Sequence, residues 1–191
     1  MTPNIVKETA NGFVCTTLQE ELFYNREVEC IGTIDRESVD SLIQQLLYLQ
    51  RQNPKKPITM YINSWGGEVA SGLALYDIMQ GLSCPIRTIC VGTAASMASL
   101  LFASGNKRDM LPHSRVMIHD PLIADMPGGS ALKVEDVSNR LMNTRKTIAE
   151  ILSKHTGKSL DEIYEKTSKD TYFNAEEAIE FGLADKIVES I

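Results

Sequence analysis

Three short apolar runs in the middle of the chain alternate with helical patterns. The runs are residues 58–63, 85–92 and 114–119, and each is bounded by turn-forming or polar residues. Residues 37–52 and 68–82 repeat apolar side chains at helical spacing, and another helix is expected after the second run. Strands that alternate with helices in this way pack as a mainly parallel sheet covered by helices. The sequence therefore predicts an α/β fold.

The flanking segments extend this pattern. Residues 26–32 alternate apolar and polar side chains, which indicates a half-exposed strand, and residues 185–190 are expected to form an edge strand. A long amphipathic helix is predicted over 131–154, about 35 Å at ~1.5 Å per residue. That length exceeds what a small domain needs, so part of the helix is expected to pack on another subunit. With 191 residues in all, we predict a single domain over residues 1–191.

The bulk composition excludes several classes of protein. A net charge of −6 and a pI near 5.1 argue against a nucleic-acid partner. The longest apolar run is far shorter than the ~20 residues of a membrane span, and the N-terminal residues do not resemble a signal peptide. Cys15, Cys30, Cys84 and Cys90 have no metal-ligand spacing and are interpreted as buried thiols. We therefore expect a cytoplasmic protein.

Ser96 is a candidate nucleophile because it follows the second apolar run. Ligand sites in open α/β sheets gather beyond the carboxyl ends of the strands. We expect Ser96 in the first turn of the next helix, where free backbone N–H groups and the helix dipole favour an oxyanion. The alternative is a helix cap. Ser99, one turn further along, is interpreted as a packing residue.

The chain has three histidines, which limits the choice of a general base. His119 ends the third apolar run on its carboxyl side, and a base or a structural role fits it equally well. His113 is expected in a solvated turn, and His155 in a capping role at a helix end. Asp120 is unsuited to orient His119, since adjacent residues in an extended strand point to opposite sides. The sequence alone does not select another acid.

Two glycine motifs also bear on function. Gly66 and Gly67 allow close backbone approach to a ligand, although many strand–helix turns contain such a pair. The run "GKS" at 157–159 resembles part of a phosphate-binding loop, but Leu152 stands where the motif needs glycine. No nucleotide site is therefore expected.

Four separated motifs resemble the ClpP family, the proteolytic subunits of the ATP-dependent Clp protease. They are "YINSWGGEVASGLALYDIM", "TICVGTAASMAS", "LPHSRVMIHDP" and "KDTYFNAEEAIEFGLAD", which occur in the family's order from about residue 35 to the end. The resemblance implies a ClpP/crotonase-like fold with a protruding handle region at about 120–155 and an N-terminal axial segment at about 1–20. It implies a serine endopeptidase with Ser96 as nucleophile, His119 as base and Asp170 as the orienting acid. The backbone N–H groups of Gly67 and Met97 would form the oxyanion hole.

The resemblance also implies partners and assembly. Unfolded polypeptides would be the substrates, delivered by an AAA+ unfoldase that uses the ATP, so this chain would bind no cofactor and no metal. Heptameric rings would stack as a tetradecamer, or pair with a paralogous ring. No nucleic acid or membrane partner is implied.

This chain departs from the family pattern near the site and on the docking surface. Trp65 replaces the proline before the two glycines, and Lys169 replaces an arginine. Thr59 and Asp109 replace aromatic residues, and Glu29 replaces an aliphatic one, at positions that contact the unfoldase in the family. These departures predict a divergent paralogue with an altered substrate groove and an altered partner.

Two other functions are compatible with the same motifs. A catalytically weak or inactive ring subunit would scaffold a mixed complex, although inactive members usually lose one of the three catalytic residues. A crotonase-type acyl-CoA hydratase or isomerase would share the fold and the oxyanion hole. The combination of Ser96, His119 and Asp170 favours the protease.

Overall fold

A computed structural model describes residues 4–10, 12–123 and 128–191 of the chain. The strands are β1 (Asn4–Thr9), β2 (Gly12–Thr17), β3 (Glu27–Ile34), β4 (Ile58–Gly67), β5 (Ile86–Ala95), β6 (Lys107–Met110), β7 (Arg115–Ile118), β8 (Thr171–Phe173) and β9 (Lys186–Ile187). The helices are α1 (Leu18–Tyr24), α2 (Arg36–Gln52), α3 (Val69–Gly81), α4 (Met97–Ala103), α5 (Ala131–Thr156), α6 (Leu160–Thr167) and α7 (Ala175–Phe181). Residues 1–3 and 11 of the predicted axial segment, and 124–127 of the predicted handle region, lie outside the described residues.

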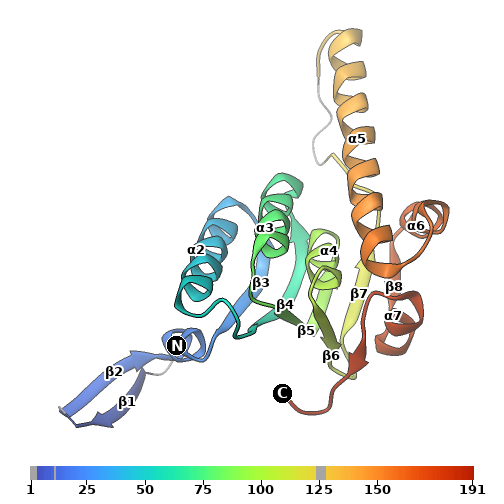
Figure 1. The fold of residues 1–191 in the computed structure, drawn as a ribbon. Helices are drawn as coiled ribbons and strands as arrows, with labels where there is room; N and C mark the ends of the chain where they lie inside the picture. The colour runs from blue at the N-terminus through green and yellow to red at the C-terminus, as the bar shows by residue number, and fades with distance from the viewer. Residues whose placement is uncertain (1–3, 11, 124–127) are drawn as a thin grey trace.

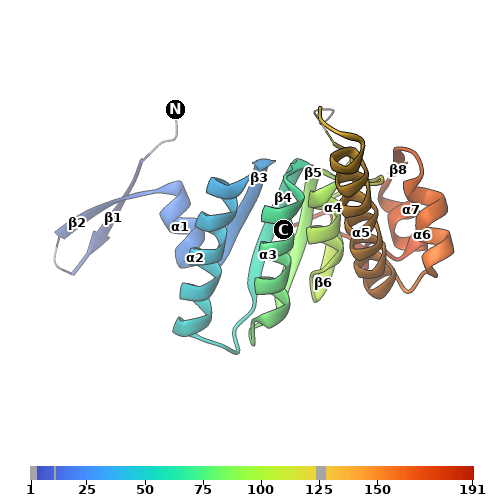
Figure 2. The same cartoon turned by 90° about the horizontal axis from the view of Figure 1, so that it is seen from above.

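The centre of the fold is a seven-stranded sheet, and the predicted α/β class is confirmed. Its strands follow the order β3-β4-β5-β6-β9, with β7 paired to β5 and β8 paired to β7. All of these pairings are parallel except that of β7 with β8. Helices α2, α3 and α4 cover one face of the sheet (Figures 1 and 2). The core lies between these helices and alternate strand residues such as Met60 and Ile62, which are fully buried, as is Leu46 on α2.

Some elements were not predicted from the sequence. The β1-β2 hairpin extends away from the sheet as an arm (Figure 1), and none of its described residues is buried. Helix α1 is only seven residues long, and its Phe23 packs against the core. Strand β6 reads "KRDM" and β8 has three residues, so neither shows an apolar strand pattern. Both form because backbone groups of a neighbouring strand are available to pair with them. The predicted edge strand at 185–190 is confirmed, but it is shortened to the two residues of β9.

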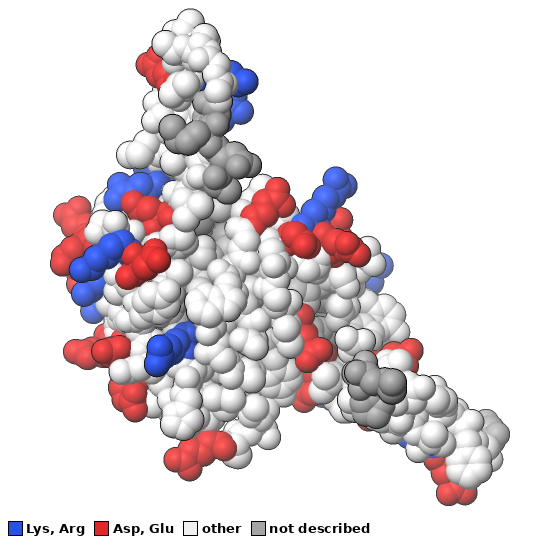
Figure 3. Space-filling model, turned by 180° about the vertical axis from the view of Figure 1, so that it is seen from behind, with Lys and Arg blue, Asp and Glu red and all other residues white. Residues whose placement is uncertain are grey.

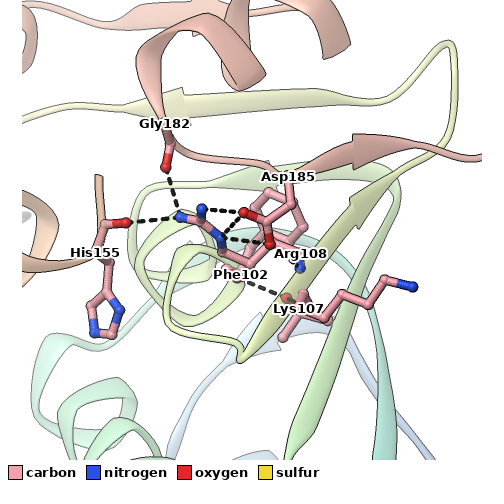
Figure 4. Close-up of polar contacts among 7 residues, drawn as sticks. Phe102, Lys107, Arg108, His155, Gly182 and Asp185 are labelled. Atoms are coloured by element: carbon pink, nitrogen blue, oxygen red, sulfur yellow. Dashed lines mark hydrogen bonds and ion pairs between the residues drawn. The ribbon is translucent and has the colours of Figure 1, made fainter. Parts of the chain in front are cut away.

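Helix α5 is the predicted long helix, and it projects well beyond the sheet (Figure 1). Its 26 residues span about 39 Å at ~1.5 Å per residue. Arg108 on β6 anchors its C-terminal end, where Nη1 donates to the carbonyl oxygens of His155 at 2.9 Å and Gly182 at 2.6 Å (Figure 4). Asp185 pairs with the same guanidinium. Burial raises the pKa of Asp185, but the hydrogen bonds and charge of Arg108 outweigh burial and hold that pKa below its usual value.

The structure also tests the predictions for individual side chains. Cys30, Cys84 and Cys90 are buried as expected, but Cys15 is exposed, because it lies on the projecting hairpin, where no element covers it. His113 is exposed in a turn, as predicted. Among the described residues, no helix is both long and apolar enough to cross a membrane.

Candidate active site

The register of three paired strands brings together residues that are far apart in the sequence. Ser96 directly follows β5, and His119 directly follows β7, in a parallel pair where Ala95 stands opposite Met117. Asp170 directly precedes β8, which runs antiparallel to β7 with Ile118 opposite Thr171. Because the end of β7 meets the start of β8, the two pairings place all three residues at one edge of the sheet.

Ser96 occupies the turn between β5 and α4. Its φ of 54° and ψ of −123° lie outside the usual regions for a residue with a side chain, and its hydroxyl forms no cap hydrogen bond with the helix. The backbone N–H of Ser96 donates to Met117 O at 2.9 Å, which fixes the turn against β7. The sequence predicted that Ser96 lies in the first turn of the helix, whereas in the structure Ser96 is the N-cap residue directly before α4. Such strained positions recur at functional sites.

His119 contacts both of the other candidate residues. Its Nε2 lies 2.8 Å from Ser96 Oγ, within hydrogen-bond distance. Its Nδ1 lies 3.5 Å from Asp170 Oδ1, which is an ion-pair distance rather than a short hydrogen bond. The imidazole is 15% exposed and the Asp170 side chain 62% exposed. The serine and histidine are therefore tightly coupled, while the carboxylate is open to solvent.

The two glycines pack against the serine turn and β3. A Cβ on Gly66 would lie 2.7 Å from Ser96 Cβ and 3.0 Å from Met97 N, closer than a side chain tolerates. Gly67 lies equally close to β3, since a Cβ there would be 2.1 Å from Ile34 O. Both glycines have positive φ. The structure thus requires glycine at both positions, and Gly66 contacts the turn that Ser96 and Met97 share.

A small, mainly apolar cavity opens beside Ser96 and His119. Side chains from α3, α4, β7 and the base of α5 form its wall, together with Ser99 and Pro121. The apolar residues from these elements are Val69, Met97, Leu100, Ile118, Ile148 and Leu152. Helix α5 therefore contributes to the site as well as projecting from the body. At about 20 Å³ the cavity has room for little more than one water molecule, so its apolar walls pack closely around the candidate residues.

The structure also tests the structural roles predicted for Ser99, Asp120 and His155. Ser99 is buried and its hydroxyl donates to Ser96 O at 2.6 Å, so it packs as expected and also supports the turn. The Asp120 carboxylate contacts Thr167 and Arg145, away from the imidazole. The His155 ring lies 3.1 Å from Tyr76 Oη through Nε2, so its ring packs on α3, while its backbone carbonyl, rather than its ring, takes part in capping.

Seen from behind, the molecule carries both signs of charge (Figure 3). Asp109, on β6, is fully buried and accepts a hydrogen bond from Arg87 Nε at 2.6 Å. Glu29 and Asp109 belong to the same face of the sheet, because Glu29, Tyr61, Ile89 and Asp109 are successive partners across it. Within the described part of the chain, no cluster of His, Cys, Asp and Glu could hold a metal ion.

Comparison with known families gives one match. The family described as Clp protease matches residues 10–191, which is nearly the whole chain. The fold described above agrees with that match, since its parallel sheet, covering helices and projecting α5 follow the arrangement that the motifs imply. The chain therefore belongs to the Clp protease family.

Proposed function

We propose that the chain is a serine endopeptidase that hydrolyses unfolded polypeptides through an acyl-enzyme at Ser96. The observation that carries the proposal is the 2.8 Å contact between Ser96 Oγ and His119 Nε2 at the carboxyl end of the sheet. Membership in the Clp protease family supports a serine peptidase independently.

In the proposed reaction, His119 removes the proton of Ser96 Oγ as the oxygen attacks the scissile carbonyl carbon. The backbone N–H groups of Gly67 and Met97 would donate to the oxyanion of the tetrahedral intermediate. Asp170 would stabilise the imidazolium while it carries the proton. His119 then gives the proton to the leaving amine, and a water molecule, activated in the same way, hydrolyses the ester.

We extend the proposal to assembly and partners. Family membership supports rings of this subunit and delivery of substrates by an ATP-driven AAA+ unfoldase, with no cofactor bound to this chain. Heptameric rings stacked through α5 as a tetradecamer, or joined to a paralogous ring, would use the exposed apolar residues Leu132, Val134 and Met142. Arg87, which pairs with the buried Asp109 and is itself 27% exposed, supports a docking partner that differs from one with purely apolar contacts. A cytoplasmic location remains a prediction.

The proposal is tested by hydrolysis of a short fluorogenic peptide. We expect the wild type to turn the peptide over and Ser96→Ala to lose at least about 10³-fold in kcat. Ser104→Ala is the matched control, because Ser104 is a serine at the opposite end of α4. Equal turnover by Ser96→Ala and the wild type would overturn the proposal, and an inactive wild-type particle of ring mass would favour the scaffolding role.

A further inference from the structure

Asp120 joins the segment of the candidate base to the segment of the candidate acid. Its backbone N–H donates to Thr167 O at 2.8 Å, and Thr167 Oγ1 donates to Asp120 Oδ1 at 2.6 Å. Asp120 directly follows His119, and Thr167, which is buried, ends α6 three residues before Asp170. The two hydrogen bonds run in opposite directions and therefore fix both the spacing and the orientation of the two segments.

Arg145 connects this pair of segments to α5. Its Nε donates to the second carboxylate oxygen of Asp120, Oδ2, at 2.5 Å, and its guanidinium lies 4.2 Å from the ring centre of Tyr164 on α6. The side chains of Arg145 and Asp120 are 26% and 33% exposed, so solvent screens this ion pair less than a surface pair. A single guanidinium thus contacts α6 and the residue after His119.

Other ion pairs of α5 have a different arrangement. Arg140 pairs with Asp136 and Lys146 with Glu150, each within the helix and each more than half exposed. Among the ion pairs of the described residues, the one between Arg145 and Asp120 links α5 to the segment that follows β7 and contains His119. Ile148, one turn further along α5, lines the cavity beside Ser96.

The Asp170 carboxylate needs such an external support. It is 62% exposed and lies 3.5 Å from His119, so neither burial nor a short hydrogen bond fixes its position. Its location instead depends on its backbone, which runs from the end of α6 at Thr167 to the pairing of Thr171 with Ile118 on β7. A small rotation of α6 relative to β7 would separate the carboxylate from the imidazole, and displacements near 1 Å can cost about 10²-fold in rate.

We propose that Asp120 and Arg145 are positioning residues that hold His119 and Asp170 in register and couple that register to α5. The inference rests on the proposed function, because it assigns a role within the same peptidase site. Arg145 stabilises the Asp120 carboxylate, and Asp120 holds the end of α6. A displacement of α5 would therefore change the distance between His119 and Asp170. Neither residue touches the substrate.

The test compares Arg145→Met with Arg140→Met, which makes the same change on the same helix at an exposed ion pair that lies within α5. We measure kcat and KM for a short peptide, the rate of fluorophosphonate reaction with Ser96, and the particle mass by light scattering. We expect Arg145→Met to lower kcat and the fluorophosphonate rate about tenfold, with KM and particle mass unchanged. Arg145→Lys should recover much of the rate, and Arg140→Met should match the wild type.

Thr167→Val provides a second variant, at the end of α6. It keeps the size of the side chain and removes the hydroxyl that donates a hydrogen bond to Asp120 Oδ1. It should reproduce the fall in kcat at constant KM. Wild-type rates in both Arg145→Met and Thr167→Val would overturn the inference and leave the proposed function intact. Rate losses that appear only together with a changed particle mass would also overturn it. A wild type that neither hydrolyses peptide nor reacts with the fluorophosphonate would overturn both.

Discussion

His119 Nε2 lies 2.8 Å from Ser96 Oγ, although the two residues are 23 positions apart in the sequence. The parallel pairing of β5 with β7 produces this contact. Ala95 stands opposite Met117, and Ser96 directly follows Ala95 while His119 lies two residues after Met117. A one-residue shift in that pairing would move the imidazole away from the hydroxyl. The hydrogen bond between Ser96 N and Met117 O makes such a shift costly.

Replacement of Asp170 tests the contribution of an exposed carboxylate. Asp170→Asn should lower kcat by about 10²-fold, less than the ~10⁴-fold loss seen when a buried acid of this kind is replaced, because solvent already screens Asp170. Peptide hydrolysis at several substrate concentrations gives kcat and KM. Asp40→Asn, at a similarly exposed carboxylate on α2, is the control and should have no effect. A wild-type kcat in Asp170→Asn would remove this residue from the mechanism.

Replacement of Gly66 tests the close approach of the glycine turn to the nucleophile. Gly66→Ala would place a methyl group 2.7 Å from Ser96 Cβ, at a φ of +96° that alanine rarely adopts. Displacement of Ser96 should lower kcat/KM by about 10²-fold or more. Gly81→Ala is the matched control, because its methyl group would meet nothing within 4 Å. It should retain full activity. Full activity in Gly66→Ala would contradict the described turn.

The alternating apolar runs and helical patterns of the sequence predict the parallel sheet, and the positions of Ser96 and His119 mark them as candidate site residues. Ser96 and His119 both follow apolar strands, and such strand ends mark sites in parallel sheets. Asp170 has no such local signal, since it is adjacent to a three-residue strand whose existence depends on pairing with β7. Only the resemblance to a family identified it. The role proposed for Arg145 could not be predicted either, because it depends on where a helix packs.

His155 predicts a dependence of stability on pH. Burial, and then the positive charges of Lys154 and Arg108, lower the pKa of His155 to about 4, below its usual 6.5. The unfolded chain therefore binds the proton more readily than the folded one between these values. The free energy of unfolding should therefore be highest above about pH 6.5 and should decrease as the pH drops toward 4.

This dependence can be measured by urea unfolding at fixed protein concentration from pH 7 to 4.5. His155→Gln removes the titrating group and should flatten the curve. His113→Gln, in an exposed turn, should keep the wild-type slope. Identical slopes in His155→Gln and the wild type would show that another group causes the acid destabilisation.

Trp65 is predicted to contact the substrate. It is 70% exposed and directly precedes Gly66, which touches the serine turn. An exposed indole at that place would gain contact area on peptide binding, so Trp65→Ala should raise KM about tenfold with little change in kcat. Tyr24→Ala, at another exposed aromatic on α1, should leave KM unchanged.

The same residue offers a direct binding signal. Trp65 is the only tryptophan of the chain, so intrinsic fluorescence reports on it alone. In Ser96→Ala, a saturating peptide should shift or quench this emission. Unchanged emission, together with an unchanged KM in Trp65→Ala, would place the substrate elsewhere.

The central claim is that Ser96 is a nucleophile activated by His119. Intact-mass analysis after treatment with a fluorophosphonate tests it most directly, with the modified residue located by peptide mapping. The account predicts one adduct per chain on Ser96 in the wild type, none in Ser96→Ala, and a reaction slowed at least about 10²-fold in His119→Ala. An adduct that forms equally fast in Ser96→Ala, or an assembled wild-type particle that stays unmodified, would contradict it.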